Sequence, residues 1–314
     1  MPDPVLILKA VVAAGGLAAM ILLACAWPWK APRQKLAAAG AASGVAVAFV
    51  VGCLVLGSKL QWPPREDVDR WLLCLAPAIV VAEFIAAFIE RSRWIAWLAR
   101  GLVAIAAGRI LLHGTTYITD FPGAARQWSA FQTVLYLGAM AVALAAVWGL
   151  LLRLAHRTSG RTVPLSIAIA SGAAALTIML SGYASGGQMG LALSGAMAGA
   201  TVASFALPKS IHLDGALGVG IVGLFALLVV GRFFGELTTA RAAILFISPL
   251  ACWLTELPYL RSRKIWQRGV LQLVAVCLPL AFVIAQAQRQ FAADSQRSNA
   301  AGQSSGDEYL NYGK

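Results

Sequence analysis

The chain has 314 residues, of which 60% are hydrophobic and only 12% are charged, and its mean hydropathy is +0.76. Ordinary soluble domains are nearer half apolar and a quarter charged, so a soluble fold of this length could not bury so much apolar surface. The formal net charge of +12 would suggest nucleic acid for a soluble protein. Here Lys and Arg stand mostly in short turns between apolar blocks, which favours the lipid bilayer as partner and argues against nucleic acid.

The apolar residues form blocks of about 17 to 25, the length of a helix that crosses roughly 30 Å of hydrocarbon. The blocks lack the alternating pattern of an outer-membrane barrel, so helices are expected. The predicted helices cover residues 5–27, 36–57, 70–90, 94–112, 129–152, 163–183, 189–207, 215–234, 242–258 and 269–287. The sequence thus predicts an all-α polytopic transmembrane helix bundle with about ten spans over residues 1–287, and a polar, disordered tail over residues 288–314.

The usual signatures of an enzyme, a metal site or a cofactor site are missing from the sequence. There is no HExxH, GxSxG or P-loop motif, and the five cysteines lie in apolar blocks without a CxxC pair. The three histidines stand at or beyond the ends of the predicted spans, where they could not ligate a haem inside the bundle. We therefore expect no metal and no cofactor, and a non-enzyme is favoured over an enzyme.

The distribution of Lys and Arg predicts the orientation of the bundle. The connections after the odd-numbered helices hold thirteen of these residues, and those after the even-numbered helices hold five. The thirteen are Lys30, Arg33, Lys35, Arg91, Arg93, Arg153, Arg157, Arg161, Lys209, Arg261, Arg263, Lys264 and Arg268. Because basic loops stay in the cytoplasm, we expect a multi-pass protein of the cell inner membrane with both termini outside the cytoplasm.

Two helix pairs resemble each other and suggest a parallel internal repeat. The predicted helices 70–90 and 94–112 contain Pro77, Glu83, a basic turn and Arg100 followed by glycine. The predicted helices 242–258 and 269–287 follow the same order with Pro249, Glu256, a basic turn and Arg268 followed by glycine. The spacings differ, so chance recurrence in helical hairpins remains the alternative.

Glu83 and Arg100 form the candidate polar pair inside the membrane. They stand eight residues before Arg91 and seven residues after Arg93, so their depths are similar, about 12 and 10 Å from the turn. Unpaired, each would be costly in the membrane, so we expect the two side chains to face each other. The pair could belong to a path for a solute or a proton, or it could only hold two helices together, and the sequence favours the second interpretation.

A second candidate site is expected on the outer face of the bundle. Arg109 and His113 are four residues apart on one helix face, and the longest internal connection follows them. The uncharged turn from Ser181 to Gln188 should lie on the same side. The candidate residues are Arg109, His113, Tyr117, Asp120, Ser181, Tyr183, Ser185 and Gln188. Such a set would suit an anion or a polyol, although a tight polar turn without function is the simpler interpretation of 181–188.

Three classes of function remain open. The first is a permease or transporter for a small solute, which the number of helices and the charges inside spans favour. The second is a non-catalytic membrane subunit or assembly factor, whose buried charges would serve packing alone. The third is a membrane enzyme that acts on a lipid-linked substrate. The sequence indicates neither the solute nor a protein partner, and no residue points to a specific reaction.

Overall fold

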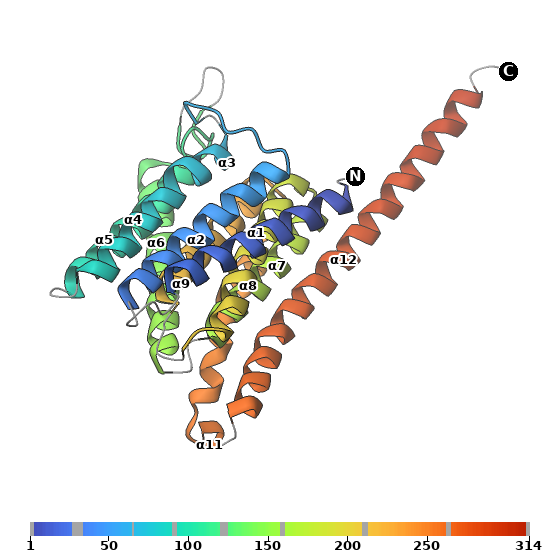
Figure 1. The fold of residues 1–314 in the computed structure, drawn as a ribbon. Helices are drawn as coiled ribbons and strands as arrows, with labels where there is room; N and C mark the ends of the chain where they lie inside the picture. Colours follow the sequence, from blue (N-terminus) through green and yellow to red (C-terminus); the bar gives the residue numbers. More distant parts are fainter. Residues whose placement is uncertain are drawn as a thin grey trace.

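The computed structural model describes residues 3–26, 34–64, 66–89, 93–119, 125–157, 161–208, 213–261 and 265–311, with the side chains of 34, 93, 258, 261, 265 and 297–311 left out. The regular elements of these residues are all helical (Figure 1). They are α1 (Pro4–Ala26), α2 (Gln34–Val55), α3 (Asp67–Arg70), the π-helix η1 (Trp71–Leu75), α4 (Ala76–Phe88), α5 (Arg93–Leu111), α6 (Ala130–Arg157), α7 (Thr162–Leu180), α8 (Ala184–Phe205), α9 (Asp214–Phe233), α10 (Thr239–Ile247), the 3-10 helix η2 (Ser248–Glu256), α11 (Pro258–Arg261) and α12 (Ile265–Asn311).

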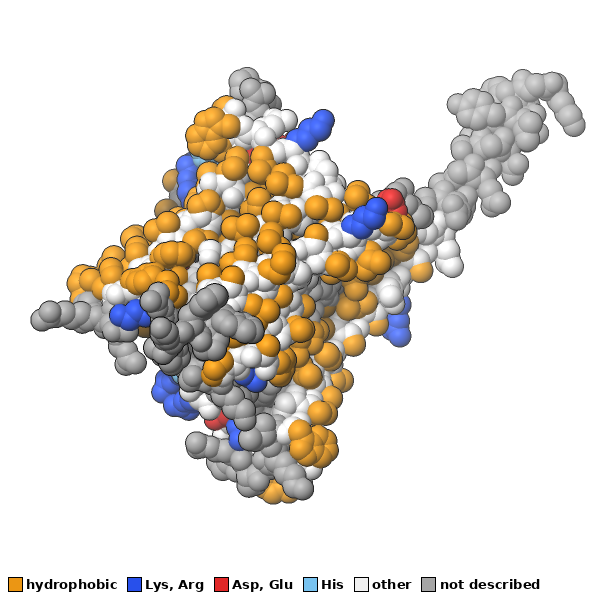
Figure 2. Space-filling model, in the orientation of Figure 1, with side chains coloured by type: hydrophobic (Ala, Val, Ile, Leu, Met, Phe, Trp, Pro, Cys, Tyr) orange, Lys and Arg blue, Asp and Glu red, His pale blue; other side chains and the backbone are white. Residues whose placement is uncertain are grey.

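Eight helical segments of the described chain are long and apolar enough to cross a membrane. They are α1, α2, the continuous α3–η1–α4 segment, α5, α6, α7, α9 and α12. The predicted all-α polytopic bundle is thereby confirmed. Figure 2 shows that hydrophobic side chains cover the middle of the face in view, whereas Lys and Arg lie mostly toward its ends, as expected for a surface in contact with lipid.

The two remaining predicted spans differ from the other eight for separate physical reasons. Helix α8 is rich in Gly, Ala and Ser and packs against α1, α2, α7 and α9, so much of its surface is shielded from lipid. The span predicted over 242–258 is not one α-helix, because α10 ends at Ile247 and η2 follows it. Pro249 stands at the start of η2, and its missing N–H group favours the change of helix type.

Helix α9 is the centre of the bundle. Its residues from Gly215 to Gly231 are all buried. It packs against α2, α4, α5, α6, α7, α8 and α10. A helix buried on every side can carry glycines that let its neighbours approach closely, which is how small residues act in membrane bundles.

Helices α1 and α8, which are distant in sequence, approach each other closely. A Cβ atom on Gly195 would lie 2.7 Å from the carbonyl oxygen of Val11, and a Cβ atom on Gly199 would lie 2.6 Å from the Cα atom of Gly15. The sequence pairs Gly195 with Gly199 at the spacing that permits such a crossing. Both positions therefore require glycine because backbone atoms of α1 occupy the space of a side chain.

The connections gather at two ends of the bundle, which we name by their acidic residues. Helices α2, α5, α7 and α9 end at the Asp67 end, and α4, α6, α8 and α11 end at the Asp214 end. The C-terminal helix α12 starts at the Asp214 end, runs along the bundle and continues past it, so the start of α1 and the end of α12 lie toward the same end (Figure 1).

Helix α12 continues to Asn311, and the disorder expected over 288–314 stays a prediction. Residues 288–299 include Ala, Gln and Arg, which have high helix propensity, and contain no Gly. The division of the chain into a membrane domain over 1–287 and a tail over 288–314 stays a prediction.

Candidate functional site

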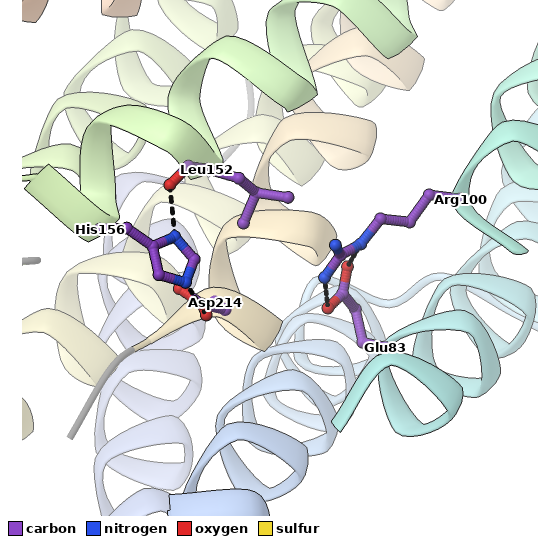
Figure 3. A network of polar contacts seen from close by, with 5 residues as sticks. All are labelled: Glu83, Arg100, Leu152, His156 and Asp214. Carbon is purple, nitrogen blue, oxygen red and sulfur yellow. Dashed lines mark hydrogen bonds and ion pairs between the residues drawn. The ribbon is translucent and has the colours of Figure 1, made fainter. Parts of the chain in front are cut away.

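The Glu83 and Arg100 side chains face each other inside the bundle, as the hairpin geometry predicts. Arg100 donates from Nε to Oε1 of Glu83 at 3.0 Å and from Nη2 to Oε2 at 2.8 Å (Figure 3). The Glu83 side chain is 2% exposed and the Arg100 side chain 12% exposed. Two parallel charge-assisted hydrogen bonds of this kind offset much of the desolvation of both groups.

Three elements hold this ion pair in place. Glu83 comes from α4 and Arg100 from α5, and these two helices pack against each other. The guanidinium of Arg100 lies 5.7 Å from the ring centroid of Trp97 and 5.8 Å from that of Trp148. Aromatic rings at this distance attract a cation, so Arg100 is stabilised in its position even where Glu83 does not cover it.

A cavity of about 1110 Å³ opens at the Asp214 end and reaches Arg100. Its walls come from α2, α4, α5, α6 and the first residue of α9. The lining residues are Lys35, Ala38, Ala86, Ala87, Ile89, Ala96, Trp97, Arg100, Ala145, Ala146, Gly149, Leu150, Leu152, Arg153, His156, Arg157 and Asp214. Glu83 is not among them, so Arg100 stands between the buried carboxylate and the cavity.

His156 and Asp214 form a second polar pair in the lining. The Nδ1 atom of His156 lies 2.7 Å from the carbonyl oxygen of Leu152, and its Nε2 atom lies 3.1 Å from Oδ2 of Asp214 (Figure 3). A carbonyl and a carboxylate only accept hydrogen bonds, so both ring nitrogens donate only in the imidazolium form. The geometry therefore favours a cation at His156.

The lining carries an excess of positive charge. The cationic side chains are Lys35, Arg100, Arg153 and Arg157, joined by the imidazolium of His156, while Asp214 is the one acidic side chain among the lining residues. A cleft whose walls carry one sign of charge raises the local concentration of counter-ions. The chemistry of this cavity is therefore suited to an anion.

The Asp67 end contains a smaller cavity, of about 390 Å³. Three of the predicted outer-face residues line it: Tyr183, Ser185 and Gln188. Its other lining residues come mainly from the connection between α2 and α3 and include Lys59, Glu66 and Asp69. Tyr183 donates a hydrogen bond from its hydroxyl to Oδ2 of Asp67 at 3.2 Å, which ties the turn before α8 to the start of α3.

The remaining outer-face candidates lie at the same end but away from this cavity. Arg109 and His113 are exposed and line neither cavity, and Arg70 donates to the carbonyl oxygen of His113. Tyr117 packs against the rings of Trp128 and Phe233. Ser181 is engaged locally, since its hydroxyl donates to the carbonyl of Thr177 and its own carbonyl accepts from the backbone of Glu236. Asp120 lies outside the described residues.

The predicted outer-face set is thus divided between a cavity and its surroundings. The turn 181–188 and the segment after α5 share one end of the bundle, but Arg109, His113 and Tyr117 do not enter the cavity that Tyr183 lines. A role of these residues in function stays a prediction. From the sequence, membrane orientation alone explains Lys35, Arg153 and Arg157, and nothing singles out His156 or Asp214 as part of a site.

A weak signal for the missed residues is present in the sequence. Arg153, His156 and Arg157 are spaced by three and four residues, which places them on one face of α6. Asp214 and Gly218 are four apart on α9, and Gly218 lies against Glu83. Helical spacing alone does not show that these two faces meet, because they belong to helices distant in sequence.

The two helix pairs of the suggested repeat share one feature. Arg268 of α12 lies 3.4 Å from Glu256 of η2, as Arg100 of α5 lies 2.8 Å from Glu83 of α4. Their surroundings differ, because α4 packs against α2 and α9 whereas η2 packs against α6, α7 and α10. The similarity is therefore local to the hairpins, and a repeat of the whole bundle stays a prediction.

The described residues bring no three His, Cys, Asp or Glu side chains together as a metal site. Comparison with protein-family models and with curated proteins finds no match for the chain. The two cavities and the ion pair between α4 and α5 are the features of the described residues that bear most directly on function.

Proposed function

We propose that the protein is a permease for a small anion that carries a carboxylate or a phosphate. The observation that carries the proposal is the position of Arg100, a cation inside a span that lines a cavity of about 1110 Å³. Arginine pairs with carboxylates and phosphates through parallel hydrogen bonds. Its bonds to Glu83 use Nε and Nη2, and among the described residues no hydrogen bond occupies Nη1.

Orientation in the membrane does not account for this arginine. Basic residues in the connections are explained by the tendency of such loops to remain in the cytoplasm. Arg100 lies two turns inside α5 with a side chain only 12% exposed, where a charge is costly and typically marks a solute or ion pathway. The cations nearer the mouth of the cavity, such as Arg153 and Arg157, would then attract the anion toward Arg100.

The arrangement of the two cavities supports transport over simple binding. One opens at the Asp214 end and the other at the Asp67 end, and no described residue lines both. A transporter that exposes its site to one side at a time needs such an arrangement. In this proposal the Asp214 end faces the cytoplasm of the cell inner membrane, as the thirteen basic residues predict.

One observation favours the alternative of a membrane subunit. An apolar groove of about 750 Å³ lies between α10–η2 and α12 and is lined by residues such as Ile247, Trp253, Leu254 and Pro279. A partner helix could occupy it, but in a bilayer an acyl chain fills such a groove equally well. Orientation explains the basic residues near the mouth of the cationic cavity in a subunit as well, but it does not explain Arg100 inside a span, so the permease is preferred.

Uptake by liposomes that contain the full-length protein tests the proposal. Labelled acetate, succinate and inorganic phosphate are offered separately, and we expect uptake of at least one above that of protein-free liposomes. Arg100→Gln should lower this uptake by about tenfold or more, because a hydrogen bond to a charged group contributes about 1.5–3 kcal/mol. Arg109→Gln is the matched control, since Arg109 is an exposed arginine that lines neither cavity. Uptake of none of the three anions, or equal loss in both variants, would contradict the proposal.

A further inference from the structure

We propose that Glu83 takes up a proton when an anion binds to Arg100, so that anion and proton bind together. The inference rests on the proposed function and adds the coupling ion to it. It follows from the position of Arg100, which contacts Glu83 on one side and lines the cavity on the other.

The anion and Glu83 compete for the guanidinium of Arg100, because Nη1, which Glu83 does not engage, offers only one side of the parallel pairing that a carboxylate or phosphate forms with arginine. Arg100 meets both oxygens of Glu83 with Nε and Nη2, the pair of donors best placed for parallel bonds to a carboxylate. An anion that enters the cavity gains most from the guanidinium if it replaces at least one of these bonds. Binding therefore weakens the pairing of Glu83.

Glu83 has little else to compensate its charge. Its side chain is 2% exposed and it does not line the cavity, so water does not solvate the carboxylate as it would at a surface. A buried carboxylate without its partner is strongly destabilised, and the usual response is to take up a proton and become neutral. The carboxylate and one proton give a neutral carboxyl group, while Arg100 keeps its charge and pairs with the anion.

The charges around Glu83 leave Arg100 as its counter-ion. From α5 the facing group is Arg100, and from α9 Gly218 lies directly against the carboxylate. Asp214 stands one turn nearer the mouth on α9 and, being acidic, opposes ionisation of Glu83. Helix α2 contributes Lys35 to the cavity lining, and η1 is apolar throughout. Among the described residues, only Arg100 forms an ion pair with Glu83.

Coupling predicts a defined dependence of binding on pH. If one proton binds with each anion, the apparent affinity for the anion should fall by about tenfold for each unit by which the pH rises. This holds over the pH range in which Glu83 is ionised in the free protein. Acetate, succinate and inorganic phosphate are titrated into purified full-length protein by calorimetry at several pH values. Two buffers of different ionisation enthalpy at each pH give the number of protons taken up, after correction for the titration of the anion itself.

Variants assign the proton to Glu83. Glu83→Gln should bind the anion without proton uptake and with an affinity that no longer follows pH. His156→Gln should keep the pH dependence, although His156 lines the cavity, and Glu256→Gln should keep it because Glu256 lies in the other hairpin. If Glu83→Gln does not fold, the wild-type measurement still decides, because binding without proton uptake overturns the inference.

The failures of the two proposals are distinguishable. Anion binding and Arg100-dependent uptake without a coupled proton would leave the permease intact and overturn the coupling. Coupled binding without any uptake by liposomes would overturn the permease and leave the coupling intact. If none of the three anions binds, both proposals are wrong. Proton uptake that persists in Glu83→Gln overturns the assignment to Glu83.

Discussion

Gly218 of α9 lies so close to the Glu83 side chain of α4 that a Cβ atom on the glycine would stand 2.7 Å from the carboxyl carbon of Glu83. The missing side chain creates the space in which the buried carboxylate sits. A helix at the centre of the bundle thereby helps to set the distance between Glu83 and Arg100.

Gly218→Ala should displace the Glu83 carboxylate and weaken its bonds to Arg100. Overpacking of this kind typically costs about 1–3 kcal/mol, which should appear as a lower unfolding temperature of the purified protein in detergent. The matched control is Gly101→Ala on α5, because a Cβ atom there would meet nothing within 4 Å. This control should be neutral or stabilising by up to about 1 kcal/mol through helix propensity. Equal effects of the two substitutions would contradict the role of Gly218.

A double-mutant cycle should show strong coupling between Glu83 and Arg100. Either single variant, Glu83→Gln or Arg100→Gln, should lose about 3–5 kcal/mol of stability, because each removes the ion pair and leaves either Arg100 without its counter-ion or a buried Glu83 that must take up a proton. The double variant should lose less than the sum of the two by at least about 1 kcal/mol. Unfolding by denaturant in detergent provides the measurement.

The other hairpin supplies a matched control for this cycle. Glu256 and Arg268 are also paired, but at 3.4 Å and with side chains 10% and 24% exposed. A longer and more exposed ion pair contributes less, so the same cycle there should give a coupling below about 1 kcal/mol. Coupling of equal size in both hairpins would mean that burial of Glu83 is not the cause.

The crossing of α1 and α8 should be intolerant of a single methyl group. Gly199→Ala would place a Cβ atom against backbone atoms of Gly15, which cannot rotate away as a side chain can. We expect a loss of about 1–3 kcal/mol, measured as a shift of the unfolding transition. Gly16→Ala, next to the contact on α1, meets nothing within 4 Å and should have little effect. Tolerance of Gly199→Ala would show that α1 is not held at this distance.

Tyr183 should remain protonated well into the alkaline range. Burial, followed by the nearby charge of Asp67, raises the pKa of its hydroxyl to about 12. A phenol whose pKa is higher in the folded protein than about 10 in the unfolded chain contributes stability that is fully present below about pH 10 and is lost as pH rises through about 12. The stability difference between wild type and Tyr183→Phe should therefore shrink over this interval. Tyr136→Phe controls for loss of an exposed hydroxyl, and a difference that does not change with pH would contradict the prediction.

The contact between Glu83 and Arg100 could be predicted because local rules determine it. A tight turn makes two helices antiparallel, and the rise per residue then gives the depth of each charge. The contact of His156 with Asp214 could not be predicted in this way, since it depends on how α6 packs against α9. The cavity at the Asp214 end also depends on how these helices pack. From the sequence alone, its basic residues in the connections are therefore explained by membrane orientation.

Fusion reporters should place both the C-terminus and the Asp67 end outside the cytoplasm. The structure brings the described basic residues Lys35, Arg153 and Arg161 to the Asp214 end, and the sequence puts thirteen Lys and Arg in the connections of that end against five at the other. A bias of this size normally keeps the richer end in the cytoplasm. A fluorescent reporter that folds only in the cytoplasm should be silent when fused after Lys314 and bright when fused after Arg157. Alkaline phosphatase, which is active only outside the cytoplasm, should give the opposite pattern at both positions. Bright fluorescence after Lys314 together with silence after Arg157 would show that the bundle has the opposite orientation in the membrane. The cationic cavity would then have to collect its anion from outside the cell.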